Sequence, residues 1–203
     1  MIERPGHLVL AYHGCDAAVR DMLLESPDQT LKLSVNPYDW LGKGAYFFED
    51  DWMRALAFAV TAHDHPEKKY TARPIHDPVV VGAVLRIHRW LDMGTREGIH
   101  AYMTAHDDLV AKGTKIKVNK PADPEDVEML LRPMDRQILN HVHAMREADG
   151  APAYNAVRSH FPQGASLLET SGFRADTHIQ IALRHPECVV GFFRVREAEI
   201  DIP

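Results

Sequence analysis

Apolar residues recur at strand spacing near both ends of the chain. Five segments have this pattern and are predicted to be strands: 7–13, 45–48, 79–87, 178–183 and 189–196. The clearest of them is 79–87. Segments with helical spacing of apolar residues separate the two strand-rich ends.

Helical spacing of apolar residues follows the first two strands. Asp16 is expected to cap a short helix that Pro27 stops. Asp50 or Asp51 is expected to cap a second helix, which runs to about His63. Each of these strands is thus followed by a helix.

The middle of the chain, about 91–150, is predicted to be a helical insertion. One helix is expected over 95–112, with Gly113 as its C-terminal stop. A second is expected to open at Asp123-Pro124. Pro133 should break or kink it before it continues toward the end of the insertion.

Length and composition fit one globular domain that spans residues 1–203. Of the 203 residues, 45% are hydrophobic and 26% are charged, which is enough for a substantial core. Strands at the ends and helices in the middle predict the α+β class. The net charge of -6 argues against a protein that coats nucleic acid through a general electrostatic field, but it leaves room for a local basic patch.

The chain also carries signals about its compartment. No segment has the length of a membrane span or the shape of a signal peptide, so we expect a cytoplasmic protein with no membrane partner. In a reducing compartment Cys15 and Cys188 are expected to be free thiols.

Two histidine pairs raise the question of a metal. His63/His65 and His141/His143 lack the i,i+4 spacing that puts two imidazoles on one helix face, and no cysteine cluster accompanies them. We expect surface histidines and no metal site.

The most informative residues close the first strand and open the second. Tyr12-His13-Gly14 ends an apolar run, and Tyr46 follows His13 by 33 positions in the string Gly42-Lys43-Gly44-Ala45-Tyr46-Phe47-Phe48. The glycines do not form a nucleotide loop, because a dinucleotide fingerprint needs a third glycine where Phe47 stands and a Walker loop needs serine or threonine after the lysine. They are expected to let the chain turn tightly into an aromatic strand.

A third candidate lies on the predicted strand 178–183. Alternation puts Gln180 on the face opposite the three large aliphatic residues, so it faces a cleft if those residues enter the core. The preceding segment, 161–177, contains glycines and small polar residues, as expected of a long loop across a site. Glu169 in that loop and Glu187 after a proline are rival candidates, which rank below Gln180.

In order and spacing, His13, Tyr46 and Gln180 resemble the His-Tyr-Glu triad of ADP-ribosyltransferases of the diphtheria-toxin and poly(ADP-ribose) polymerase type, with glutamine in place of glutamate. The resemblance spans most of the chain, and its most specific part is 36–50. It implies an ADP-ribosyltransferase-like split β-sheet core that carries the helical insertion.

The activity that the resemblance implies is that of a glycosyltransferase. The chain would be an NAD-dependent mono-ADP-ribosyltransferase, with NAD as co-substrate and a protein or nucleic acid as acceptor. An intracellular bacterial toxin or defence factor would fit a compact transferase of this kind, and an antitoxin is then a partner to consider. Two alternatives stay open: a catalytically inactive binding module of the same fold, and an NAD glycohydrolase in which water replaces the acceptor.

The resemblance also assigns roles to residues. His13 would position NAD as a hydrogen-bond donor to a ribose hydroxyl, and Gly14 would bind the nicotinamide carboxamide through its backbone. Tyr46 would pack its ring against nicotinamide, with a dispensable hydroxyl, and Phe58 would form a second aromatic wall. Gln180 would accept a hydrogen bond from the ribose 2'-hydroxyl, but it adds no negative charge beneath the developing oxocarbenium ion.

Overall fold

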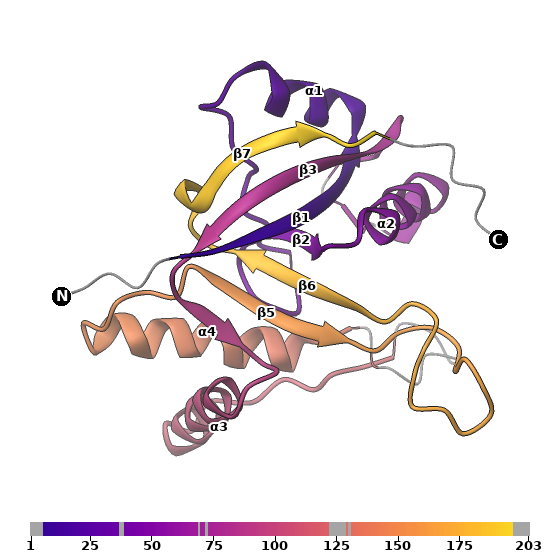
Figure 1. Cartoon of the computed structure of the whole chain (residues 1–203). Coiled ribbons are helices and arrows are strands. Elements are labelled where there is room, and N and C mark those ends of the chain that lie inside the picture. Colours follow the sequence, from indigo (N-terminus) through magenta and orange to yellow (C-terminus); the bar gives the residue numbers. More distant parts are fainter. Residues whose placement is uncertain are drawn as a thin grey trace.

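Figure 1 shows the computed structural model of the chain, which describes residues 6–36, 39–68, 70–71, 73–121, 129 and 131–196. Within these residues the strands are β1 (His7–Asp16), β2 (Ala45–Glu49), β3 (Pro78–Ile87), β4 (Trp90–Asp92), β5 (Ala156–Phe161), β6 (His178–Leu183) and β7 (Val189–Arg194). The helices are α1 (Ala17–Glu25), α2 (Trp52–Asp64), α3 (Arg96–Ala111) and α4 (Pro133–Ala148), with short 3-10 turns at Pro66–Lys68 and Pro186–Cys188.

The strands form one sheet in the order β4-β5-β6-β2-β1-β3-β7. Neighbouring strands are antiparallel, except that β4 and β5 run parallel. The α+β class is therefore confirmed as a mostly antiparallel open sheet with helices packed on it.

The sheet opens between β1 and β2. β1 pairs with β3 along its whole length, but it pairs with β2 only at Ala11↔Glu49 and Tyr12↔Phe48. In Figure 1, β1, β3 and β7 spread away from β6 and β5 beyond this point. The chain segment that begins at His13 therefore lies along an opening in the sheet.

Helices cover both faces of the sheet. On one face, α2 packs over β1 and β3 around Phe48 and Val80, while α3 and α4 pack over β4, β5 and β6 around Val157 and Ala182. On the other face, α1 packs against Val81 and its neighbours. Figure 1 shows α1 beside β7 and β3, and α3 with α4 beneath β5.

Carboxylates cap the first two helices, as the sequence predicts. The Asp16 side chain accepts the backbone N–H of Ala18 at the start of α1. For α2 the cap is Asp51, whose side chain accepts the N–H of Arg54 at 2.8 Å. Asp50 adopts φ 53°, so it turns the chain before the helix instead of capping it.

The expectation that Pro133 kinks a helix is wrong. Pro133 is the first residue of α4, where its fixed φ suits the helix and its missing N–H is not needed. The expected helix start at Asp123-Pro124 lies outside the described residues. The strands β4 and β5 were not among the predicted elements, and β4 occupies the start of the expected helical insertion.

The two cysteines are free and buried, which confirms the expectation of unpaired thiols. Burial raises the pKa of the Cys15 thiol to about 12. Across the part of the chain that the structure describes, no helix combines the length and the apolar character needed to cross a bilayer.

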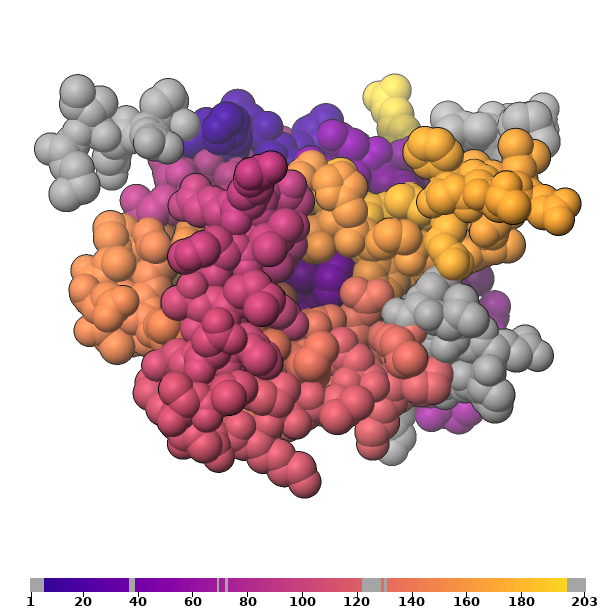
Figure 2. Space-filling model, turned by 90° about the horizontal axis from the view of Figure 1, so that it is seen from below, coloured from indigo at the N-terminus to yellow at the C-terminus, as the bar shows by residue number. Residues whose placement is uncertain are grey.

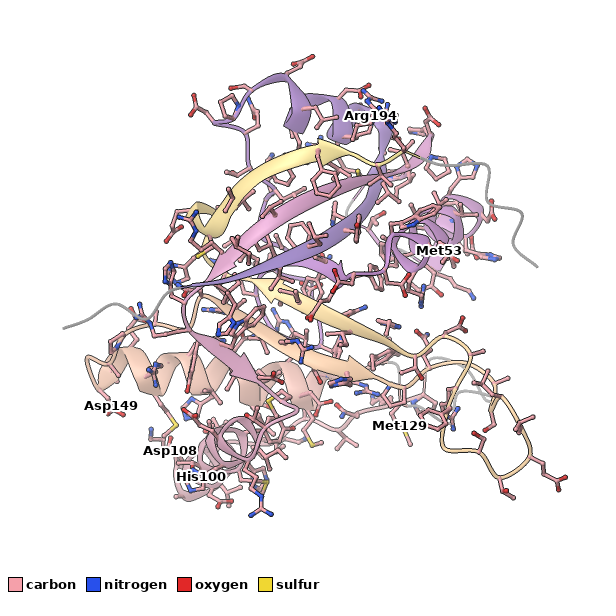
Figure 3. The ribbon with its side chains drawn as sticks, viewed as in Figure 1. Met53, His100, Asp108, Met129, Asp149 and Arg194 are labelled. Carbon is pink, nitrogen blue, oxygen red and sulfur yellow. The ribbon has the colours of Figure 1, made fainter. Side chains whose placement is uncertain are left out.

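The second histidine pair is not on the surface, contrary to expectation. His141 Nε2 lies 2.6 Å from the carboxylate of Asp108, which Figure 3 labels on α3. His143 packs edge-on against Tyr154, and burial lowers its pKa to about 3. Both rings are half-buried because α4 packs against α3 and shares a core cluster with the sheet. His63 and its neighbour His65 are exposed, as predicted.

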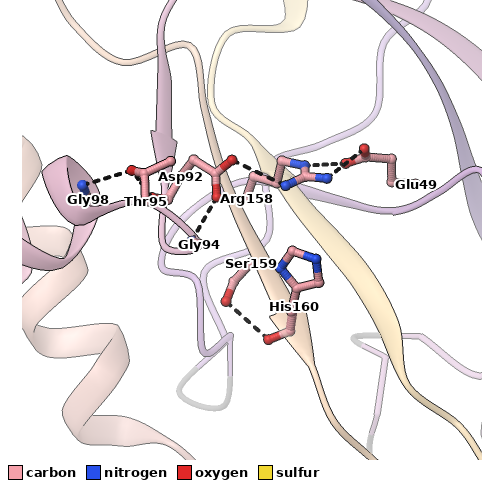
Figure 4. Close-up of polar contacts among 8 residues, drawn as sticks. All are labelled: Glu49, Asp92, Gly94, Thr95, Gly98, Arg158, Ser159 and His160. Carbon is pink, nitrogen blue, oxygen red and sulfur yellow. Dashed lines mark hydrogen bonds and ion pairs between the residues drawn. The ribbon is translucent and has the colours of Figure 1, made fainter. Parts of the chain in front are cut away.

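A charged network joins three strands on one face of the sheet (Figure 4). The Arg158 guanidinium on β5 donates two hydrogen bonds to Glu49 at the end of β2, at 2.6 and 2.9 Å. It donates a third to Asp92 on β4, at 3.1 Å. These side chains are largely buried, and the pKa of Arg158 is raised chiefly by its hydrogen bonds to Glu49.

Candidate active site

The three strands that carry His13, Tyr46 and Gln180 are neighbours in the sheet, as β1, β2 and β6. Tyr46 lies opposite Ala182, and Phe48 lies opposite Gln180. Because residues two apart in a strand share a face, Tyr46 and Gln180 point to the same face of the sheet. The structure thus brings together residues that are far apart in the sequence.

His13 lies where β1 parts from β2, and its ring bridges the opening. Its Nδ1 is 2.7 Å from the backbone carbonyl oxygen of Tyr46, and its ring lies 5.8 Å from that of Phe47. By strand alternation the ring belongs to the Phe47 face, whereas Tyr46 and Gln180 point to the other. His13 therefore reaches Tyr46 through the backbone and not through the tyrosine ring, and the three side chains do not meet on one face of the sheet.

The hydrogen bond to Tyr46 decides the protonation of His13. A carbonyl oxygen only accepts, so Nδ1 carries the hydrogen. Burial lowers the pKa of His13, which keeps the ring neutral at pH 7. Its Nε2 is then a hydrogen-bond acceptor. The donor role expected from the resemblance would need a hydrogen on Nε2, which this tautomer lacks.

Gly14 is required by the packing of α2. A Cβ at this position would lie 2.0 Å from the carbonyl oxygen of Ala55 and 3.2 Å from the Cβ of Ala59. Only glycine lets the helix approach β1 so closely. The glycine after His13 therefore has a structural reason to be there, in addition to the nicotinamide contact that the resemblance implies.

The hydroxyl of Tyr46 makes two hydrogen bonds. It donates to the carbonyl oxygen of Gly42 at 2.8 Å and accepts the N–H of Leu41 at 3.0 Å. These two bonds fasten the turn that leads into β2. Burial raises the pKa of Tyr46 well above 10, so the hydroxyl stays neutral and can make both bonds.

Phe58 lies on α2 and is half-buried. Its ring centroid is 6.2 Å from that of Phe48 and 6.5 Å from that of Tyr70. The contact to Phe48 places it on the same side of the sheet as Tyr46 and Gln180. An aromatic residue thus stands beside this face from the α2 side.

Gln180 is half-buried, and its side-chain oxygen has a partner. The indole Nε1–H of Trp40 donates to Gln180 Oε1 at 2.6 Å. Since an indole nitrogen only donates, the amide oxygen must be the atom that faces Trp40. The bond expected from a ribose hydroxyl would need this same oxygen.

The rival glutamates lie elsewhere. Glu169 is an exposed residue of the loop between β5 and β6. Glu187 is exposed in the turn before β7, where its carboxylate bonds to its own backbone N–H and to His185. Neither is placed on the strand face that carries Tyr46 and Gln180.

Aromatic residues that sequence reasoning missed surround Gln180. Trp40 and Phe161 have ring centroids 4.8 Å apart, and the Arg132 guanidinium lies over both rings. Two residues before Gln180, His178 packs between Phe161 and Phe48. Trp40 and Phe48 carried a sequence signal, because both lie inside the string 36–50.

His178 is buried with one ring nitrogen unpaired. Its Nδ1–H donates to the carbonyl oxygen of Asp176 at 2.6 Å, and its Nε2 is buried without a hydrogen-bond partner among the described residues. Burial lowers the pKa of His178, so the ring is neutral.

Hollows lie on more than one part of the surface. Figure 2 shows a hollow whose floor comes from the early, indigo-to-purple part of the chain, with magenta, orange and salmon segments around it. Two separate cavities, of about 310 and 540 Å³, are lined by residues from β7 and its surroundings and not by His13, Tyr46 or Gln180.

Comparisons of the chain with protein-family models, with curated proteins and with solved structures gave no match.

Proposed function

We propose that the chain is an NAD-dependent mono-ADP-ribosyltransferase, a glycosyltransferase that moves ADP-ribose from NAD to a macromolecular acceptor. One observation carries the proposal. His13, Tyr46 and Gln180 lie on three adjacent strands, with Tyr46 and Gln180 on one face, and His13 bridges the opening between β1 and β2 from the other face through its bond to the Tyr46 backbone. The sheet that opens after Tyr12, with α3 and α4 added to it, supports the finer proposal of a split core with a helical insertion.

In the proposed reaction the bond between C1' of the ribose and nicotinamide breaks, and nicotinamide leaves with the bonding electrons. The acceptor nucleophile then bonds to C1' and loses its proton. Positive charge grows on the ribose during this step, so groups that hold the sugar rigidly lower the barrier.

The residues of the candidate site would share this task. His13 would accept a hydrogen bond from a ribose hydroxyl through Nε2, and Gly14 would hold the carboxamide through its backbone. Tyr46 and Phe58 would flank nicotinamide with aromatic surface. Gln180 would orient the ribose. The carboxylate of Glu49 is already bound by Arg158, so it is not a free replacement for the missing glutamate.

One observation favours a second candidate, a binding module without catalysis. The side chain of Gln180 carries no charge, and its oxygen is already bonded to Trp40. Without a carboxylate the site stabilises the oxocarbenium ion less, which suits tight binding of a nucleotide better than cleavage.

The products formed from NAD distinguish these functions. The protein is incubated with NAD labelled in its adenylate part and with a cell extract as the source of acceptors. A transferase yields a labelled macromolecule. Free labelled ADP-ribose alone identifies a glycohydrolase. Unchanged NAD identifies a binding module without catalysis. His13→Ala serves as the control, because it should remove labelling if the candidate site is responsible.

A further inference from the structure

We propose that Trp40 is a positioning residue for Gln180, which makes the Gln180 amide nitrogen the group that meets the ribose; this inference rests on the function proposed above. The indole Nε1–H of Trp40 bonds to Gln180 Oε1 at 2.6 Å. The two residues are 140 positions apart in the chain, so the contact exists only in the folded protein.

Trp40 is itself held in place. Its ring packs against Phe161 with centroids 4.8 Å apart and a 44° tilt between the planes. The Arg132 guanidinium lies 5.0 Å from the Trp40 ring centroid and 4.4 Å from that of Phe161. An indole ring packed against an aromatic ring and a guanidinium has few orientations open to it, so its single N–H keeps its direction.

This fixed donor selects one orientation of the Gln180 amide. Reversing the amide would place its NH₂ group against the indole N–H, donor against donor. Within the described part of the chain Gln180 Nε2 makes no hydrogen bond, and it is not among the buried unpaired atoms. The NH₂ group therefore reaches solvent, and it is the end of the amide that a ligand can meet.

The consequence concerns what Gln180 recognises. An NH₂ group donates, so it pairs with an oxygen acceptor of the ribose, such as the oxygen of a hydroxyl that donates its own hydrogen elsewhere. A carboxylate at position 180 would behave differently. Trp40 would hold one of its oxygens, and the other would face the ribose as a charged acceptor.

The contact is testable without any ligand. The protein has three tryptophans, so its ¹⁵N–¹H spectrum contains three indole signals. Trp52→Phe and Trp90→Phe remove two of them and identify the Trp40 signal by elimination. Gln180→Leu should then move the Trp40 signal upfield, because the hydrogen bond is lost, and leave the Trp90 signal in place. A Trp40 signal that does not move in Gln180→Leu overturns the proposal.

The role in the reaction is tested by the rate of nicotinamide release. Trp40→Phe should lower kcat about tenfold, the scale of one oriented hydrogen bond, with KM for NAD changed less than about twofold. In a Gln180→Leu background the same substitution should change kcat less than about twofold, because the group that Trp40 positions is gone. The matched control Trp90→Phe, at the far edge of the sheet on β4, should behave as wild type.

The outcomes separate the two proposals. An equal loss of rate from Trp40→Phe in both backgrounds shows a purely structural tryptophan and overturns the positioning role. A wild-type protein that releases no nicotinamide overturns the proposed function, and the role of Trp40 in the reaction falls with it. The indole signal still reports whether Trp40 holds Gln180.

Discussion

At the residue scale, Tyr46 is held by its hydroxyl as well as by its ring. The two bonds to Leu41 and Gly42 tie the turn before β2 to the strand itself. A family resemblance that uses only the aromatic surface gives no reason for these bonds. The hydroxyl is expected to contribute to stability whether or not the ring meets nicotinamide.

Tyr46→Phe should therefore destabilise the protein. The substitution leaves a buried N–H and a carbonyl oxygen without their partner, which costs about 1–3 kcal/mol. For a chain of this size the melting temperature should fall by roughly 2–4 °C for each kcal/mol. Thermal unfolding followed by circular dichroism measures the change, with Tyr70→Phe on the surface as control. A melting temperature equal to that of wild type would show that water replaces the hydroxyl at no cost.

The buried histidines predict a loss of stability in acid. His13, His143 and His178 all have pKa values lowered by burial, that of His143 to about 3. Below pH 6.5 these three histidines bind protons more readily in the unfolded chain than in the folded one. Their contribution to the free energy of unfolding is therefore largest above pH 6.5. It falls as the pH drops below that value, by up to about 1.4 kcal/mol per pH unit for each histidine.

His143→Phe should make this fall shallower. The ring size is kept and the titrating group is removed, so the slope between pH 6.5 and 5 should decrease by up to about 1.4 kcal/mol per pH unit. Urea unfolding at several pH values gives the slope. Identical slopes for wild type and His143→Phe would mean that His143 is solvated.

At the scale of elements, the Arg158 network ties β2 to the edge of the sheet. Arg158 on β5 bonds to Glu49 on β2 and to Asp92 on β4, and β6 runs between β5 and β2. The network thus spans the strands that carry Tyr46 and Gln180. Loss of the network should therefore destabilise the whole sheet.

Arg158→Met should destabilise the protein by about 2–4 kcal/mol, because it leaves two largely buried carboxylates without their cation. The matched control is Lys112→Gln, which removes an exposed pair with Asp108 one turn away in α3 and should cost less than about 0.5 kcal/mol. Chemical denaturation compares the two. Equal effects would show that the network is as well solvated as a surface ion pair.

The sequence reveals some elements and hides others for physical reasons. β1, β2, β3, β6 and β7 and the caps Asp16 and Asp51 follow from apolar pattern and local hydrogen bonding. β5 is hidden because Ala156 and Val157 are both fully buried while polar residues follow them, so no period of two appears. Pro133 breaks a helix in its interior but starts one at its first position, and the sequence alone does not say which applies.

At the scale of the whole molecule, the candidate site is assembled from segments near 13, 46 and 180 by the strand order β1-β2-β6. The order and spacing of His13, Tyr46 and Gln180 could be found in the sequence through the family resemblance. The bond from Trp40 to Gln180 could not, because the fold alone brings these residues together. The tautomer of His13 likewise depends on where the Tyr46 carbonyl points.

The central claim is that this assembly binds NAD. Calorimetric titration of the wild-type protein with NAD tests it most directly, without assuming catalysis or knowledge of an acceptor. We predict saturable binding of one NAD per chain, with a dissociation constant below about 1 mM, the upper end of usual enzyme substrate affinities. His13→Ala should weaken this binding about tenfold, because the ribose loses its hydrogen-bond acceptor. The absence of saturable binding to the wild-type protein up to about 1 mM NAD would contradict the account.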